Sequence, residues 1–150
     1  MQLLECDLDQ RLTRLLASAA RDKGSSFAEV ARLSGLKKDT VRRTLSGERQ
    51  PTLIEAVSIL EALGQPGELT LLFMILIDED FALERSGSEI ARFLGELFRL
   101  TPVELVEMLG LDVDELRPRW AKGTAKLLAR TLAHHVADLN RRGDAIGERS

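Results

Sequence analysis

The sequence predicts an all-α protein. Leu, Ala, Glu and Arg, which favour helices, dominate its 150 residues, whereas β-branched residues are scattered singly among them. Apolar residues recur at helical spacing, and short breaks at glycine and proline separate the periodic segments. A chain of this length buries enough surface for one sizeable core or for two small cores that share an interface. We therefore expect one or two helical domains.

The first predicted helix follows Asp7 or Asp9 as its N-cap and ends at Lys23-Gly24. The second helix begins after Ser26, which forms a capping box with Glu29, because each side chain can satisfy a free backbone N–H of the other residue. The apolar positions expected to face inward on these two helices are Leu8, Leu12, Leu15, Leu16, Ala19, Phe27, Val30, Ala31 and Leu33.

Ser34-Gly35 ends the second helix, and a third is predicted over residues 38–45, stopped by Ser46-Gly47 with Pro51 beyond it. A fourth helix runs from Thr52 to Leu63 before Gly64 and a second stop at Pro66-Gly67. Its predicted inward positions are Leu53, Ala56, Val57, Leu60 and Leu63.

Residues 71–77 are apolar on all sides, as expected of a buried helix. We expect an apolar connecting helix over residues 68–85, forming either a core shared by two units or a dimer seam. The predicted organisation is therefore a domain at 1–67, this connection, a second helical unit at 86–140 and a tail at 141–150.

Charge is unevenly distributed, although the net charge is only −3. Six basic residues between positions 32 and 49 face two acidic ones, Asp39 and Glu48. Residues 71–116 carry three basic and eleven acidic groups, whereas residues 117–150 carry eight basic and three acidic groups. The first cluster fits a footprint on phosphates, and a solvated helix face is the alternative explanation.

Residues 8–65 resemble the helix-turn-helix domains of the λ-repressor/Cro (XRE-like) family. A small residue, Ala31, stands where the next helix crosses closely, Gly35 follows four residues later in the turn, and Val41 comes six residues after that. The capping box, the stop after the third helix and the proline-led fourth helix add to the resemblance. It implies a DNA-binding domain and a regulator of transcription.

The resemblance also implies that the third helix enters the major groove with its N-terminal part. Lys38 and Arg42 are then candidates for contacts with guanine, Thr40 for a thymine methyl group or a phosphate, and Arg43 and Arg49 for phosphates. The candidate DNA-binding residues are Ser26, Lys37, Lys38, Asp39, Thr40, Arg42, Arg43 and Arg49.

Two positions in this site have more than one interpretation. Asp39 is a candidate acceptor from cytosine N4, or simply an acid favoured by the helix dipole in the first turn. Phe27 stands where the family often has a glutamine that contacts phosphate. Ser26 and the free N–H groups of the second helix are the substitutes available for that contact.

The second half of the chain aligns with the first at a constant offset of 75 residues. TPVELVEMLGLDVDELRPRW, at residues 101–120, places Thr101 under Ser26 and Gly110 under Gly35, and helical signals flank it on both sides. We expect a degenerate helix-turn-helix unit at 86–140. Its third helix would be acidic and would contain Pro118, so it is expected to dimerise, to pack on the first unit or to bind a protein partner.

Other classes of function receive little support from the residues. His134 and His135 are adjacent, so on a helix they point about 100° apart and do not converge on one ion. Without a catalytic set or a phosphate loop, we expect no enzyme, metal or cofactor. The expected partner is palindromic duplex DNA, bound by a homodimer. The alternative is an antitoxin-like or other protein-binding regulator, whose C-terminal half would engage a toxin, or RNA polymerase, as its protein partner.

The sequence also predicts a cytoplasmic location. The N-terminus lacks the basic stretch and apolar block of a secretory signal, and Cys6 is the one cysteine, so no internal disulfide can form. The longest apolar run, residues 71–77, is far shorter than a membrane span.

Overall fold

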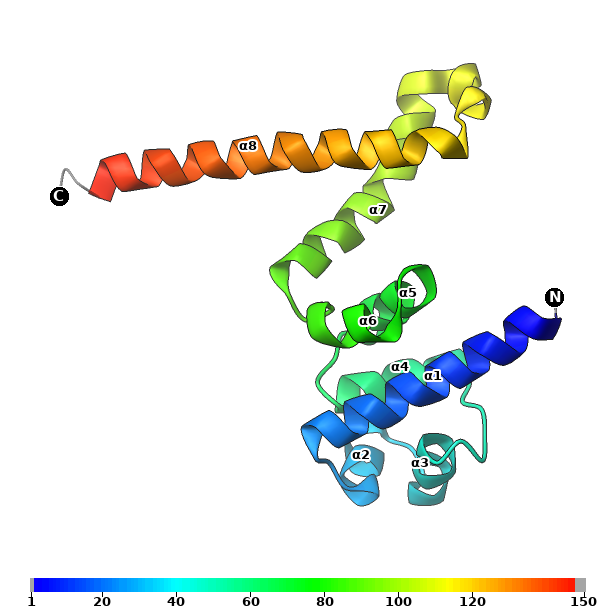
Figure 1. Cartoon of the computed structure of the whole chain (residues 1–150). Coiled ribbons are helices and arrows are strands. Elements are labelled where there is room, and N and C mark those ends of the chain that lie inside the picture. The colour runs from blue at the N-terminus through cyan, green and yellow to red at the C-terminus, as the bar shows by residue number, and fades with distance from the viewer. Residues whose placement is uncertain (1, 148–150) are drawn as a thin grey trace. The chain divides into compact units, whose positions relative to one another are not determined.

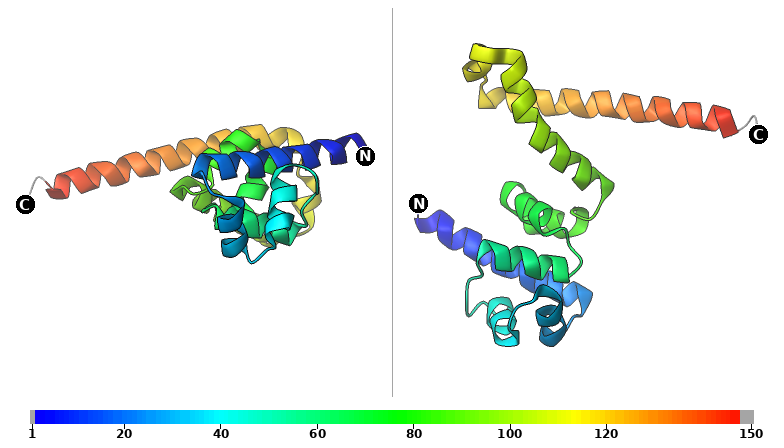
Figure 2. Two further views of the ribbon diagram at one scale, coloured as in Figure 1. Left: turned by 90° about the horizontal axis from the view of Figure 1, so that it is seen from below. Right: turned by 180° about the vertical axis from the view of Figure 1, so that it is seen from behind.

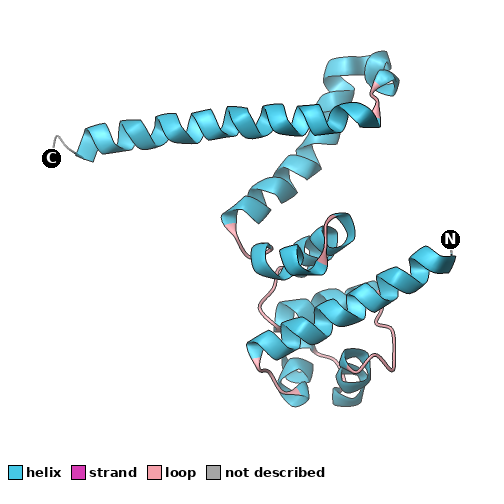
Figure 3. Cartoon of the chain, viewed as in Figure 1, coloured by secondary structure: helices cyan, strands magenta, loops and turns pink. Residues whose placement is uncertain are grey.

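The computed structural model describes residues 2–147, with side chains for residues 7–142, and this part of the chain contains helices and no strands (Figures 1 and 3). The predicted all-α class is confirmed. The α-helices are α1 (Gln2–Lys23), α2 (Phe27–Ser34), α3 (Lys38–Leu45), α4 (Leu53–Ala62), α5 (Gly67–Leu76), α6 (Glu79–Arg85), α7 (Glu89–Leu109) and α8 (Ala121–Gly147).

The chain divides into two compact units, residues 1–100 and residues 101–150, and the boundary falls within α7. This division differs from the predicted boundaries near residues 67 and 85. The first unit holds every buried apolar side chain found among the described residues, from Leu15 to Ala91.

Helix α1 contacts α3, α4, α5 and α6, and Figure 2 shows it running across the first unit. It begins at Gln2, earlier than the predicted caps at Asp7 and Asp9, because residues 2–6 contain no helix breaker and continue the helix. The predicted stop is confirmed, since Gly24 adopts a φ of +67°. Leu15 and Leu16 are fully buried, whereas Leu8 is 39% exposed.

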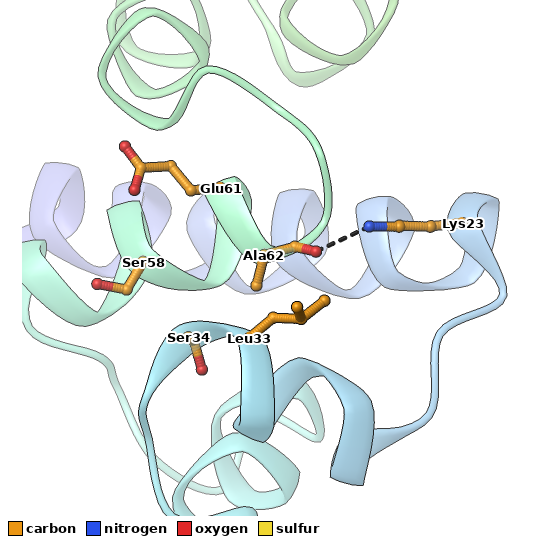
Figure 4. A pocket seen from close by; sticks show the side chains of 6 residues that line it. All are labelled: Lys23, Leu33, Ser34, Ser58, Glu61 and Ala62. Carbon is orange, nitrogen blue, oxygen red and sulfur yellow. Dashed lines mark hydrogen bonds between the residues drawn. The ribbon is translucent and has the colours of Figure 1, made fainter.

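Helix α2 has the predicted N-cap at Ser26, and α4 has a cap at Thr52 that was not predicted. The Ser26 hydroxyl accepts a hydrogen bond from the Glu29 amide at 3.2 Å, which is one half of the predicted box. The complete capping box is at α4, where the Thr52 hydroxyl accepts from the Glu55 amide at 3.3 Å and the Glu55 carboxylate accepts from the Thr52 amide at 2.8 Å. At the other end of α4, Lys23 Nζ donates to the Ala62 carbonyl oxygen at 2.8 Å (Figure 4).

Besides Leu8, three apolar residues expected to face inward are exposed instead. Phe27 and Leu33 are 42% and 47% exposed, because Val30 and Ala31 form the inner face of the short helix α2. Leu53 is 72% exposed at the start of α4, where Ala56, Ile59 and Leu60 make the core contacts.

The single connecting helix predicted over residues 68–85 is wrong, because this segment forms α5 and α6. The break lies at Asp78, whose carboxylate accepts from the Phe81 amide at 2.7 Å and so caps α6. Helix α5 buries Leu71, Phe73 and Met74 in the core of the first unit. The other face of α5 is exposed, so the helix is not buried on all sides as predicted.

Hydrogen bonds from two arginines of α1 hold α5 and α6 in the first unit. Glu79 accepts hydrogen bonds from Arg11 at 3.3 Å and from Arg14 at 2.9 Å, and Arg11 also donates to the Met74 carbonyl at the end of α5. Ser86, which has the spacing of a capping box with Glu89, is fully buried instead.

The buried Ser86 hydroxyl lies in a chain of hydrogen bonds. It accepts from the Thr70 hydroxyl at 2.9 Å and donates to the Gln65 side-chain oxygen at 2.9 Å. Ser88 takes over the capping role, since its hydroxyl accepts from the Ala91 amide at 3.4 Å. The hydroxyl of the buried Ser86 therefore has both a donor and an acceptor as hydrogen-bond partners, as a buried polar group requires.

The second half of the chain does not fold as a repeat of the first. Helix α7 continues through Thr101 and Pro102, where the alignment predicted a new helix. The aligned position explains the difference: Gly24, with its φ of +67°, reverses the chain in the first half, whereas Arg99 lies at this point of the second half and remains helical.

The rest of the second half also departs from the predicted repeat. Gly110 ends α7 with a φ of +55°, much as Gly35 ends α2, but two 3₁₀ segments follow, η1 (Gly110–Glu115) and η2 (Pro118–Trp120). Pro118 begins η2, consistent with its inability to donate within a longer helix. Helix α8 then begins at Ala121 and extends to Gly147, through much of the predicted tail.

Candidate nucleic-acid interface

The segment from α2 to α3 has the geometry that the spacing of Ala31, Gly35 and Val41 predicts. Helix α2 packs against α3 and α4, and α3 also packs against α1. Val41 is fully buried and Ala31 is 7% exposed, so both face the helix contacts. Gly35 has a φ of +72°, a conformation that L side chains rarely adopt, and it turns the chain between the two helices.

The outer face of α3 collects most of the predicted site. Lys37 is the N-cap residue of α3, and the side chains of Lys38, Asp39, Arg42 and Arg43 are exposed. Thr40 is half-buried. Ser26 is exposed at the start of α2, where its hydroxyl already accepts from the Glu29 amide.

Arg42 is held in place by two acidic residues. Its Nη2 lies 3.0 Å from Asp39 Oδ1, one turn earlier on the helix, and its Nη1 lies 3.2 Å from Glu48 Oε1. The hydrogen bond with Asp39 and the charge of Glu48 raise the pKa of Arg42 above its usual value. Asp39 therefore has a third role that sequence reasoning missed: it positions the guanidinium of Arg42.

Glu48 contacts both arginines of α3. Its Oε2 lies 3.9 Å from Arg43 Nε, and its Oε1 also accepts from the Ser46 hydroxyl at 3.0 Å. Of these ion pairs, only Asp39–Arg42 could have been predicted from the sequence, because residues three apart lie side by side on a helix. The Glu48 contacts cross the turn after α3 and required the structure.

Arg49 forms a two-pronged ion pair with Glu55. Arg49 Nη1 and Nη2 donate to Glu55 Oε2 and Oε1 at 2.9 and 3.0 Å, and this pair joins the loop after α3 to the capping box of α4. The hydrogen bond raises the pKa of Arg49 and lowers that of Glu55, which the Thr52 amide lowers further. Arg49 is thus already paired with Glu55 in the protein without DNA. It is not an unpaired cation that is free to bind a phosphate.

Lys37 and Lys38 differ from the arginines in this respect. Among the described residues, neither lysine has an acidic group within ion-pair distance. Both residues stand at the start of α3, where the first backbone N–H groups of the helix have no partner within it. This end of α3 is the part of the site that is most available to an anion.

The Arg49–Glu55 pair makes the stability of the first unit sensitive to acid. Because the folded-state pKa of Glu55 is lowered, its contribution is complete above the ordinary glutamate pKa and is lost as pH falls through the folded-state value. We expect Glu55→Gln to lower the unfolding temperature by a few degrees at pH 7 and by much less at pH 3, in thermal melts followed by circular dichroism. Glu61→Gln, at an exposed site on the same helix, is the control. An equal effect of Glu55→Gln at both pH values would contradict this prediction.

Other features of the described residues point to no second site. A shallow hollow of about 430 Å³ between α2 and α4 is lined by Lys23, Leu33, Ser34, Ser58, Glu61 and Ala62, and its lysine is already used to cap α4 (Figure 4). No cluster of three or more potential metal-ligating side chains is found in the described part of the chain. No single described helix is long and apolar enough to cross a membrane; α4 and α5 meet that test only as a pair bent by 114°.

Two short helices joined by a glycine turn, with the second helix presenting a basic face, define a DNA-binding domain of the helix-turn-helix class. Residues 11–73 match the family model described as a helix-turn-helix domain, so the chain carries such a domain in its N-terminal half, as the resemblance implied. No curated protein and no solved structure matches the chain.

Proposed function

We propose that the chain is a sequence-specific regulator of transcription that reads the major groove of duplex DNA with α3. The observation that carries the proposal is the exposed basic face of α3 within a matched helix-turn-helix domain. The opposite face of the same helix, at Val41, Thr44 and Leu45, is buried, so the direction in which the basic face points is fixed by the core.

The side chains divide into those that read bases and those that hold the backbone. Lys38 and Arg42 contact base edges, with Asp39 orienting Arg42 and Thr40 near a thymine methyl group or a phosphate. Lys37, Arg43 and the N-terminus of α2 at Ser26 contact phosphates. Arg49 also contacts the phosphate backbone of the DNA, but its main role is to fix the loop after α3 through its ion pair with Glu55.

We further propose that the regulator acts in the cytoplasm as a homodimer, without a cofactor or an enzymatic activity of its own. One recognition helix covers only a few base pairs, and two such helices related by a twofold axis meet successive major grooves about 34 Å apart. The expected operator is therefore a palindrome with half-sites about one helical turn apart.

Selection of bound sequences from a random duplex library tests this function directly. We expect a palindromic site to emerge, and the logarithm of its binding constant to fall against the logarithm of salt with a slope of about −4 to −5, for roughly five neutralised phosphates. Recovery of no preferred sequence, or a salt-independent affinity, would contradict the proposal.

Glu48 competes with DNA for the arginines of α3, which gives a second prediction. Glu48→Gln removes the charge that holds Arg42 and Arg43 and that repels phosphates, so affinity should rise about two- to fivefold. Because the effect is electrostatic, specific and random duplexes should gain alike in fluorescence-anisotropy titrations. Glu61→Gln should change neither affinity. Weaker binding by Glu48→Gln would show that Glu48 supports the bound state instead.

A protein-binding regulator is the second candidate, since the described part of the second unit exposes many apolar side chains. Copurification of the native protein from its host discriminates the two. A stoichiometric heterologous partner in place of self-association would favour this candidate over the dimeric regulator.

A further inference from the structure

Helix α8 carries an apolar stripe that the other described residues of the second unit leave uncovered. None of the side chains described between residues 101 and 142 is buried, and α8 makes its principal contacts with the short segment η2. Large apolar side chains of α8 are exposed: Leu128, Val136 and Leu139 are 37%, 53% and 53% exposed. A helical unit without buried apolar side chains needs a partner to stabilise it.

The stripe runs straight along one face of α8. At 100° per residue, Ala121, Ala125, Leu128, Leu132, Val136 and Leu139 fall within an arc of about 80°. The basic residues Lys126, Arg130 and Arg141 lie on the opposite face. A helix packed against this stripe would therefore keep these cations away from the contact.

The order of sizes along the stripe indicates what covers it. The residues at its start are small, Ala121 and Ala125, and those at its end are large, Val136 and Leu139. If two copies of α8 pack antiparallel around Arg130, Ala121 of one copy lies opposite Leu139 of the other, because both are nine residues from that centre. Leu128 then lies opposite Leu132, and Ala125 opposite His135.

We infer that α8 of a second copy of this chain occupies the stripe, in an antiparallel pair whose twofold axis crosses the stripe at the level of residue 130. Ala121 against Leu139 makes the two ends of an antiparallel pair equally wide, with Leu128 against Leu132 near its centre, whereas a parallel pair would be narrow at Ala121 and wide at Leu139. Such self-complementarity about a centre is what an isologous contact between identical copies requires. The inference rests on the proposed function for its purpose, which is to pair two DNA-binding units.

Paired substitutions of leucine test the face. Leu132→Asp places a charge in the stripe, whereas Leu127→Asp makes the same change at a 66% exposed site on the other side of α8. We expect Leu132→Asp to raise the dimer dissociation constant by roughly thirtyfold or more, and Leu127→Asp to leave it unchanged, in sedimentation or light scattering of the full chain. A monomeric wild-type protein, or equal effects of the two changes, would overturn the inference.

Disulfide trapping tests the orientation without relying on a disruptive variant. In a Cys6→Ser background, chains carrying Ala121→Cys and chains carrying Leu139→Cys should cross-link on mixing and should not cross-link alone. Cross-linking of Ala121→Cys chains with one another would show a parallel pair and overturn the inference. So would a dimer that survives Leu132→Asp but is lost in Ile54→Asp, since the exposed Ile54 lines an apolar groove between α4 and α5.

The histidine pair supplies a further contrast. His135 lies about 20° beyond the edge of the stripe's arc, where it borders the contact, whereas His134 lies on the other side of α8, so His135→Leu should tighten the dimer and His134→Leu should not. Tightening by both variants alike would contradict the assigned face. Assembly is measured without DNA, so loss of operator recognition with an intact dimer would refute the proposed function while leaving this inference standing.

Discussion

Replacing Arg42 with Ala is expected to weaken binding to the selected operator by about 5- to 150-fold, the range for loss of a base contact. The change removes the guanidinium that Asp39 orients, and it leaves Asp39 and Glu48 without their cation beside the phosphates. Binding to random duplex should fall much less, because base contacts are absent there. Anisotropy titrations with both duplexes measure the ratio.

Two companion variants sharpen this result. Asp39→Asn keeps Arg42 but loosens its orientation, so it should reduce the preference for the operator more than the overall affinity. Arg85→Ala removes an exposed arginine from α6, a helix that packs against α1 and α5, and should alter neither affinity. Equal losses on operator and random duplex would reassign Arg42 to a phosphate.

Replacing Leu60 with Ala is expected to destabilise the first unit by about 2–5 kcal/mol, through lost burial and the cavity that remains. Leu60 is fully buried on α4, whereas Leu53 on the same helix is 72% exposed. Leu53→Ala should therefore cost little. Urea unfolding of the two variants measures the difference, and equal destabilisation would show that Leu53 is covered in solution.

Local signals were sufficient for much of the first unit. The stop at Gly24, the cap at Ser26, the turn at Gly35 and the span of α3 were all predicted from residues within one or two turns. Each depends on backbone chemistry that a short segment carries by itself, namely a free N–H to satisfy or a positive φ to adopt.

The second half shows where local signals failed. Thr101 and Glu104 have the spacing of a capping box, yet α7 passes through them. A capping box can begin a helix only where the residues before it are not helical. Gly24, with its positive φ, ends the preceding helix in the first half, whereas Arg99 at the aligned position remains helical. The residues that match between the two halves do not include Gly24, whose place in the second half is taken by Arg99.

The sequence by itself determined the all-α class, the helix-turn-helix segment and the set of basic residues on α3, because helix periodicity, caps and glycine turns are local. Only the tertiary structure decided which of those cations are free. Arg42 and Arg43 meet Glu48 across a turn, and Arg49 meets Glu55 at the start of the next helix, whereas Lys37 and Lys38 keep their charges unpaired among the described residues. Those pairings depend on where the core places neighbouring helices, and burial of Val41 and Leu45 beneath α3 fixes that placement.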